Sequence, residues 1–317
     1  MAHNAPMNRS FFATCALGLE DVLRDELKAI GAEDVRAMRG RVGFRGPLAM
    51  GYKACLWLRS ASRVQEQLFR NRPGGTRQQL YEAIYDFDWA PTLQPDNTLA
   101  VYAAVRDSTA TDNRFVSLVT KDAIVDQMRD RYGSRPDVDS KNPDAPIRVI
   151  LKQDRLSVLR DLSGDSLHRR GWRPIQVKSP LNEAIAAGLL MVAGWKGDQT
   201  LYDPMCGSGT FLVEAAHIAQ DRAPGLRRRF AFQQWPDLEL TAWRDLRDEA
   251  EQRFAQGQKR AVNIQGSDHH PGALGLARRS LEVAQVRDSV KVRRMSVERA
   301  VLDGVPQLVV SNPPWGL

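Results

Sequence analysis

The sequence predicts an α/β protein whose carboxyl-terminal half is a parallel sheet with helices on both faces. From Pro180 onward, apolar strand-like segments alternate with amphipathic helical segments, which is the pattern of consecutive β-α units. One strand-like segment runs into the glycine turn DPMCGSGT, residues 203–210, and a helical segment follows. The first half of the chain mixes helices and strands in another order, so a smaller α+β region is expected there.

The amino-terminal region is expected to begin with a helix between residues 19 and 30. Apolar residues recur there at intervals of three and four, and Gly31 then ends the pattern. Short strands are expected around Val35 and over residues 42–44, with a turn between them. These elements predict a small α+β module.

A second α/β unit is expected to end near residue 165. Residues 98–105 are typical of a strand, 112–133 of a helix and 147–163 of a hairpin. A loop rich in proline and aspartate separates the helix from the hairpin.

The carboxyl-terminal alternation gives the expected order of the parallel sheet. A long insertion, residues 221–260, interrupts the first crossover and is expected to be helical at its end. Helices are expected at 181–195, 210–220 and 271–285, and strands at 200–206, 261–268, 290–294 and 307–315.

Composition narrows the class of protein. The chain has 317 residues, 43% hydrophobic content, a formal net charge of +7 and a pI of about 9.5, which is consistent with a soluble protein that binds a polyanion. Three widely spaced cysteines indicate neither a disulfide framework nor a zinc site, and no metal site is expected. The longest apolar run is too short to span a bilayer and the amino terminus has no signal-peptide core, so a cytoplasmic protein without a membrane anchor is expected.

The glycine turn is typical of a ligand site. A parallel strand that ends in glycines and leads into a helix presents backbone N–H groups at the edge where such sheets bind ligands. Because Leu212 stands where G-x-G-x-x-G has its third glycine, NAD and FAD are disfavoured, and the absence of a following Gly-Lys-Ser/Thr excludes a Walker A loop. The alternative is a turn that only closes a β-α unit.

Two further motifs end neighbouring strands. Asp268 closes GSD and is placed to accept hydrogen bonds from a ribose, or alternatively to cap the helix that follows. In SNPPW, the Asn312 carboxamide, the Pro313 carbonyl and the Trp315 ring form a receptor for a planar base with an exocyclic amine. The alternative for this motif is a strand terminator, because two prolines cannot extend a ladder.

In this order, DPMCGSGT, GSD and NPPW resemble the motifs of class I AdoMet-dependent methyltransferases that modify exocyclic amines. Segments elsewhere, including GLEDVLRDELKAIGA, TKDAIVDQM, DLSGDSLHRRGWR, SPLNEAIAAGLLMVAGW and DRAPGL, resemble the bacterial 23S rRNA guanine-N2 methyltransferases. The resemblance implies an amino-terminal ferredoxin-like region over residues 1–50, a THUMP RNA-binding domain over 51–165, and an incomplete Rossmann-like methyltransferase domain over 166–317. It also implies that the chain is truncated after NPPW.

The resemblance assigns roles to individual residues. Asp203 would hold the ammonium group of S-adenosyl-L-methionine, the turn would approach its methionine part, and Asp268 would hold the ribose. Asn312 and Pro313 would hold the target amine of guanine while Trp315, in place of the family's tyrosine, stacks on the base. The implied cofactor-binding set is Asp203, Pro204, Gly207, Ser208, Gly209, Asp268 and Ser296, and the implied catalytic set is Asn312, Pro313, Pro314 and Trp315.

The implied partner is 23S rRNA or its large-subunit precursor. Two arginine clusters are candidates for phosphate contacts, Arg169, Arg170 and Arg173 in one and Arg227, Arg228 and Arg229 in the other. Two alternatives stay open, a non-catalytic THUMP RNA-binding protein or fragment of a longer enzyme, and an adenine-N6 methyltransferase, to whose amine NPPW offers the same acceptors. The oligomeric state and the RNA-contacting face are not predicted.

Overall fold

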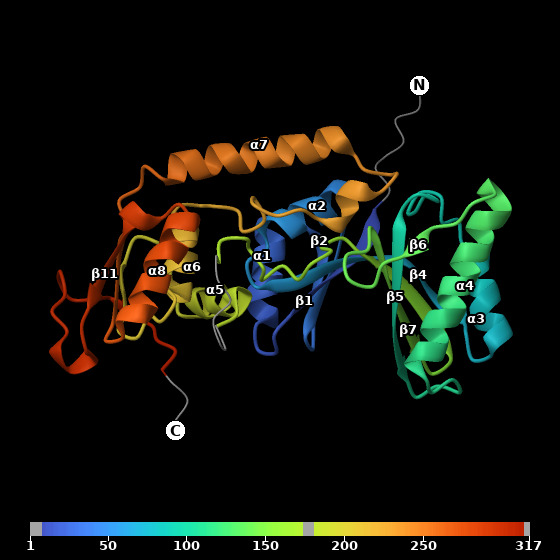
Figure 1. The fold of residues 1–317 in the computed structure, drawn as a ribbon, viewed down its shortest axis with the longest axis horizontal. Helices are drawn as coiled ribbons and strands as arrows, with labels where there is room; N and C mark the ends of the chain where they lie inside the picture. Colours follow the sequence, from blue (N-terminus) through green and yellow to red (C-terminus); the bar gives the residue numbers. More distant parts are fainter. Residues whose placement is uncertain (1–7, 174–180, 314–317) are drawn as a thin grey trace.

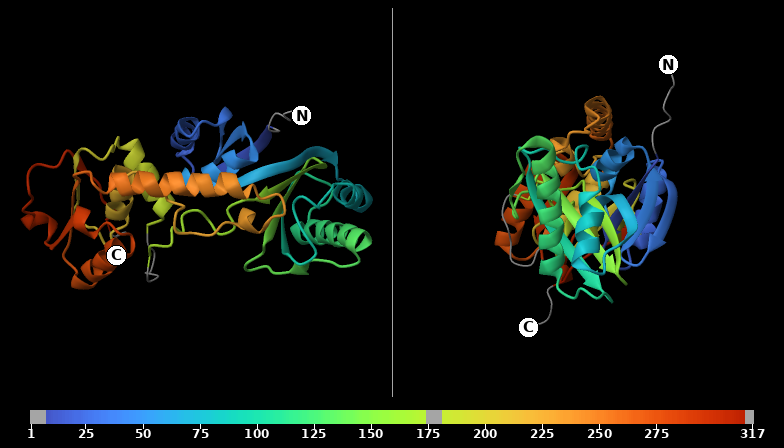
Figure 2. Two further views of the ribbon diagram at one scale, coloured as in Figure 1. Left: turned by 90° about the horizontal axis from the view of Figure 1, so that it is seen from above. Right: turned by 90° about the vertical axis from the view of Figure 1, so that its right-hand side faces the viewer.

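The structure is a computed structural model that describes residues 8–173 and 181–313 of the chain. The molecule is elongated, with the elements of residues 77–161 at one end, the amino-terminal elements in the middle and the carboxyl-terminal elements at the other end (Figures 1 and 2). An eight-stranded sheet in the order β2-β3-β1-β4-β8-β7-β5-β6 joins the first two regions, and a four-stranded sheet in the order β11-β10-β9-β12 forms the third. The mixed α/β class that the sequence predicts is confirmed.

The first region contains both strands and the helix that the sequence predicts. Helix α1 (Glu20–Ala29) ends before Gly31, which has φ +88°. The sequence prediction lacks helix α2, Leu48–Trp57, which is buried over most of its length. Residue 50, where the amino-terminal region is expected to end, lies inside this helix. The strands of this region are β1 (Arg9–Cys15), β2 (Glu33–Met38), β3 (Arg41–Gly46) and β4 (Ala61–Pro73).

The second region follows the expected strand, helix and hairpin. Helix α4, Asn113–Tyr132, is capped by Asp112 at its start and by Gly133 in the left-handed conformation at its end. The turn between β7 and β8 places Gln153 and Asp154 at positive φ, as two-residue hairpins require. The remaining elements are α3 (Arg77–Tyr85), β5 (Thr98–Arg106), β6 (Asp137–Val138), β7 (Ala145–Lys152) and β8 (Arg155–Asp161).

The four-stranded sheet of the third region is parallel throughout, as the alternation predicts. Its strand β9 lies between β10 and β12. From β9 the chain passes to β10 and β11 on one side and then returns to β12 on the other side. Such a switch point opens a crevice at the carboxyl ends of the strands. The elements are α5 (Glu183–Val192), β9 (Thr200–Asp203), α6 (Thr210–Ala219), β10 (Asn263–Asp268), α8 (Pro271–Val283), β11 (Val290–Arg294) and β12 (Leu308–Val309).

The insertion over residues 221–260 packs mainly on the first region. Its aromatic residues Phe230, Phe232 and Trp243 are buried in the same core as α1 and α2. The insertion ends in helix α7, Leu240–Gly257, which runs along the outside of the molecule (Figure 1). The Arg253 guanidinium lies 3.9 Å from the centre of the Trp57 ring, so α7 braces α2 from outside.

Two general features concern the described residues only. None of their helices is long and apolar enough to cross a membrane. They contain no group of three or more His, Cys, Asp or Glu side chains that could hold a metal ion.

Two helical glycines give a matched test of packing. A Cβ on Gly257 would overlap the carbonyl oxygen of Gln220, whereas a Cβ on Gly275 meets nothing within 4 Å. We expect Gly257→Ala to lower the free energy of unfolding by about 1–3 kcal/mol through overpacking. Gly275→Ala should raise it by up to about 1 kcal/mol because alanine has the higher helix propensity. Thermal unfolding followed by circular dichroism measures both, and equal midpoints for the two variants would contradict the close contact at Gln220.

Candidate functional site

The glycine turn lies at the carboxyl end of β9, where the sheet switches direction. Strand β9 ends at Asp203 and α6 starts at Thr210, so the chain reverses within six residues. Gly207 and Gly209 have φ values of +53° and +82°, which side chains with a Cβ rarely adopt. A Cβ on Gly209 would also lie 3.3 Å from the Cβ of Ala277 in α8. The second glycine therefore serves both the turn and the close approach of two helices.

The turn is tied to the next strand by Asp268. The Gly207 N–H donates to Asp268 Oδ2 at 3.0 Å, and the His270 N–H donates to Asp268 Oδ1 at 2.9 Å. Helix α8 is capped by the His270 ring, which accepts from Ala273, so Asp268 is not the cap of this helix. Asp268 instead holds the glycine turn against the end of β10.

Asp203 is a buried carboxyl group whose pKa is raised. It is 2% exposed, and burial, together with the nearby Asp268 carboxylate, raises its pKa to about 7. Its Oδ1 accepts from the Met205 N–H at 3.2 Å. Among the residues that the structure describes, no lysine or arginine forms a salt bridge with Asp203 or Asp268. The basic neighbour of Asp268 is the exposed His269 ring, whose Nδ1 lies 3.7 Å from Asp268 Oδ1. Two buried carboxyl groups without a lysine or arginine partner suit a ligand that brings a cation.

Helix α6 packs closely on the sheet because a large side chain on the helix faces a glycine on the strand. Leu212 occupies the position where a dinucleotide fingerprint has its third glycine. Facing it, Gly266 of β10 has no side chain, and a Cβ there would lie 2.5 Å from Leu212 Cδ1. Here the glycine that allows close packing belongs to the strand and not to the helix, so the helix still approaches the sheet closely.

The last described residues leave the sheet beside Asp203. Strand β12 pairs with β9, and the Val310 N–H donates to the Tyr202 carbonyl at 3.0 Å. Ordered pairing ends there, so β12 is shorter than the strand expected over 307–315. Asn312 and Pro313 are exposed at this edge, whereas Pro314 and Trp315 lie outside the described residues.

Ser296 lies at the same edge of the sheet, just beyond β11. The preceding residue Met295 donates its N–H to the carbonyl of Asp268 at 3.3 Å. Ser296 itself is half-buried at the start of a short 3-10 helix. Asp203, Asp268, Ser296 and Asn312 therefore come from four neighbouring strand ends.

Arg173 clamps the glycine turn from the side. Its Nη1 donates to Ser208 Oγ and its Nη2 to Thr210 Oγ1, both at 3.1 Å. Its Nε donates to Glu183 at 2.9 Å, and the Arg173 side chain is only 12% exposed. One guanidinium thus joins the start of α5, the turn and the start of α6, which is the fork geometry that arginine provides and lysine does not.

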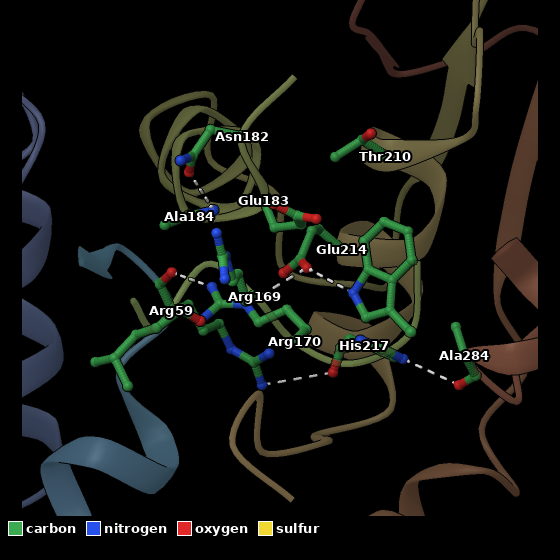
Figure 3. Close-up of polar contacts among 12 residues, drawn as sticks. Arg59, Arg169, Arg170, Asn182, Glu183, Ala184, Thr210, Glu214, His217 and Ala284 are labelled. Atoms are coloured by element: carbon green, nitrogen blue, oxygen red, sulfur yellow. Dashed lines mark hydrogen bonds and ion pairs between the residues drawn. The ribbon is translucent and has the colours of Figure 1, made fainter. Parts of the chain in front are cut away.

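A buried polar network docks α6 on the amino-terminal region (Figure 3). Glu214 of α6 is fully buried, with the Arg170 guanidinium at 3.7 Å and the Trp172 Nε1 at 3.3 Å. Arg170 also donates to the carbonyl of Arg59, and Arg59 reaches the His217 carbonyl at 3.5 Å. Burial raises the pKa of Glu214. The network links the helix after the glycine turn to the loop between α2 and β4.

Three family models match successive parts of the chain. They describe an RlmL ferredoxin-like domain over residues 10–65, a THUMP domain over 76–161, and an RMKL-like methyltransferase domain over 170–317. Among solved structures, a protein named as a predicted N6-adenine-specific DNA methylase from Listeria monocytogenes is 30% identical, with a TM-score of 0.89 over 98% of this chain and 80% of that chain. SMU.472, named as a candidate methyltransferase and solved in complex with SAH, is 30% identical, with a TM-score of 0.88 over 98% of this chain and 81% of that chain.

The chain belongs to the THUMP-domain methyltransferases. Curated relatives are the ribosomal RNA large subunit methyltransferases K/L of Methylococcus capsulatus, 41% identical over 98% of this chain, and of Hydrogenovibrio crunogenus, 39% identical over 96%. The chain spans 43% of the length of each of these two relatives. The ferredoxin-like, THUMP and Rossmann-like methyltransferase folds that the sequence predicts are confirmed.

In the structure, the two arginine clusters contain both buried and exposed side chains. Arg170 is 4% exposed and takes part in the network around Glu214, so it is not open to an RNA phosphate. Arg173 holds the glycine turn, and Arg228 donates to the carbonyls of Ser163, Asp165, Ser166 and Arg169. Only Arg169, Arg227 and Arg229 are exposed.

Sequence patterns do not identify most of the residues that support the site. Arg173 and Glu214 look like surface charges in a single sequence, and only their burial reveals their structural use. Gly266 carries a weak signal because a glycine inside a strand often marks a close approach.

The perturbed carboxyl of Asp203 gives a test by pH. Its raised pKa keeps this group protonated up to about pH 7 in the folded protein, whereas in the unfolded chain it ionises near pH 3.8, as an ordinary aspartate does. Its contribution to stability is therefore fully present below pH 3.8 and is lost as the pH rises toward 7. We expect Asp203→Asn to be more stable than the parent at pH 8 by on the order of 2 kcal/mol, and to lack this pH dependence.

Urea unfolding between pH 5 and pH 8 measures the difference. Asp245→Asn on the exposed side of α7 is the matched control and should follow the parent at every pH. A constant stability difference between Asp203→Asn and the parent across this range would contradict a raised pKa.

Proposed function

We propose that this chain provides the AdoMet-dependent methyl transfer of an rRNA methyltransferase, with the exocyclic N2 amine of a guanine in 23S rRNA as the acceptor. The observation that carries the proposal is the pairing of β12 with β9. Through it, the backbone that leads to Asn312 leaves the sheet beside the glycine turn and Asp203. A receptor for an exocyclic amine and a cofactor turn then share one edge of the sheet.

The donor set around the turn fits S-adenosyl-L-methionine. Asp203 and Asp268 offer a buried pair of carboxyl groups with no lysine or arginine partner among the described side chains, and the cofactor's ammonium would supply a cation. A Cβ on Gly207 would meet nothing within 4 Å, so the backbone there is open to the methionine part, with Pro204, Ser208 and Gly209 completing the turn. When bound, the cofactor supplies an electrophilic methyl group on a sulfonium. Ser296 would stand near the adenine, at the end of β11.

Asn312 and Pro313 would activate the target amine by position. The N2 lone pair of guanine is delocalised into the ring and is a weak nucleophile. Asn312 Oδ1 and the carbonyl of Pro313 would accept the two N–H bonds and turn the lone pair out of conjugation toward the methyl group. Transfer is then a direct displacement in which alignment and electrostatics dominate. Pro314 and Trp315, outside the described residues, would hold the backbone and stack on the base.

An RNA substrate is supported by the THUMP match, by the net charge of +7 and by the names of the curated relatives. Large-subunit rRNA is the substrate that those names print. Adenine N6 is the competing acceptor, because it offers two N–H bonds to the same carbonyl pair and one relative is named as an N6-adenine DNA methylase.

A methyl-transfer assay with Asn312→Ala tests the proposal. Labelled methyl from AdoMet should enter unmodified large-subunit rRNA and be recovered as N2-methylguanosine. Loss of one acceptor should reduce the transfer rate by about 10²-fold or more while AdoMet still binds. Label in N6-methyladenosine would assign adenine as the acceptor, and RNA binding without any transfer would support the binding-protein alternative.

Arg173→Lys tests the clamp on the glycine turn. A lysine keeps the charge beside Glu183 but cannot reach Ser208 and Thr210 together. We expect AdoMet to bind about 5- to 20-fold more weakly, measured by calorimetry, with the transfer rate at saturating AdoMet close to that of the parent. Arg169→Lys, an exposed neighbour, should change neither quantity. A loss of rate at saturation with unchanged affinity would place Arg173 elsewhere in the reaction.

A further inference from the structure

The register of the eight-stranded sheet sorts its side chains onto two faces. On one face Ala13 pairs with Val64, and Val149 pairs with Val158; these residues belong to the two amino-terminal cores. Because strands alternate with period two, the residues between them point to the opposite face. That open face carries Phe12 on β1, Gln67 on β4 and Ser157 on β8, none of which is fully buried.

The open face is hollowed and basic. Two adjoining hollows of about 660 and 370 Å³ share Phe12, Arg41, Gln67 and Arg70, so they form one groove across the ferredoxin-like and THUMP strands. The only acid among the described residues that line either hollow is Asp34, which lies 3.5 Å from Arg45. The basic lining residues are Arg36, Arg41, Arg45, Arg70, Lys152 and Arg155.

Two aromatic rings on this face lie under arginines. The Arg41 guanidinium is 4.8 Å from the centre of the Phe12 ring, and that of Arg148 is 5.2 Å from the ring of Tyr102. Gly43 pairs with Phe12, and a Cβ on it would lie 3.4 Å from the Phe12 ring, so the absence of a side chain leaves the ring room to lie over the strand. Of the two rings, Phe12 lines both hollows, and a partly exposed ring beside an arginine offers a stacking platform for an unpaired base.

We propose that this groove, defined by Phe12, Arg41, Gln67, Arg70, Lys152 and Arg155, binds a single-stranded loop of the substrate RNA. The inference rests on the proposed function for the identity of the polyanion. Charge complementarity selects a polyphosphate backbone, and the Phe12 ring selects a base that is not paired. The side chains of Arg70, Lys152 and Arg155 are exposed and make no hydrogen bond or salt bridge with other described residues, so their charges are free for phosphates.

A pair of matched charge-reversal variants tests the groove. R70E/R155E reverses two groove charges, and R77E/R114E reverses two exposed charges on α3 and α4, which cover the other face. Both carry the same change in net charge. The probe is a fluorescein-labelled transcript of a large-subunit rRNA hairpin, followed by anisotropy between 50 and 300 mM KCl.

The groove pair should lose affinity by about 10-fold or more at low salt, and its slope of log affinity against log salt should fall by about 1.4, as expected for two lost contacts to single-stranded RNA. The control pair should keep the slope of the parent. Phe12→Leu keeps an apolar side chain and removes the flat ring, and it should weaken binding by about fivefold or more without a change in slope. AdoMet binding by calorimetry should be unchanged in all variants.

The outcomes separate this inference from the proposed function. Equal losses in the two charge pairs, or an unchanged affinity in both groove variants while methyl transfer continues, would overturn the groove and leave the function standing. Groove-dependent binding without methyl transfer would support the groove and count against the function. Failure of the parent chain to bind the hairpin, with binding to anionic phosphatidylglycerol vesicles instead, would overturn both.

Discussion

The site depends on the burial of two carboxyl groups at the ends of two neighbouring strands. Asp203 and Asp268 are both nearly out of water, and the glycine turn donates to Asp268 through Gly207. Neither carboxyl has a lysine or arginine partner among the described residues, so the fold buries two acidic groups at its switch point without a strong base beside them. The clamp of Arg173 acts on Ser208 and the start of α6 rather than on these acids. The arrangement fixes the turn and leaves the carboxyl groups of Asp203 and Asp268 available to a cationic ligand.

Much of the fold follows from local signals in the sequence. The glycines Gly31 and Gly133 end helices where the periodic pattern stops, and the alternation after Pro180 gives the parallel sheet. Helix α2 escapes such reasoning because it is apolar on nearly all sides and shows no clear period. Its burial becomes intelligible only when the insertion, distant in sequence, covers it with Phe232 and Trp243.

Some side chains of the candidate site can likewise be predicted from local motifs, whereas others depend on contacts between distant segments. Asp203, Asp268 and the turn glycines are visible in sequence because motifs at strand ends have few structural uses. The roles of Arg170, Arg173 and Glu214 depend on which faces become buried between segments far apart in the chain. An arginine-rich run such as HRRGWR looks like a phosphate site, yet burial assigns two of its arginines to internal contacts. The basic groove is equally hidden, because its residues are brought together only by strand register.

Strand β4 joins the ferredoxin-like and THUMP regions by backbone pairing. Its 13 residues pair with β1 of the ferredoxin-like region and with β8 of the THUMP region, so one continuous ladder joins the two. A continuous ladder of this kind cannot hinge without breaking backbone hydrogen bonds. The network at Glu214 then fixes the four-stranded sheet to the same body. In the proposed function, the distance between the groove of the eight-stranded sheet and the glycine turn would therefore be set by the protein, and the RNA would have to match it.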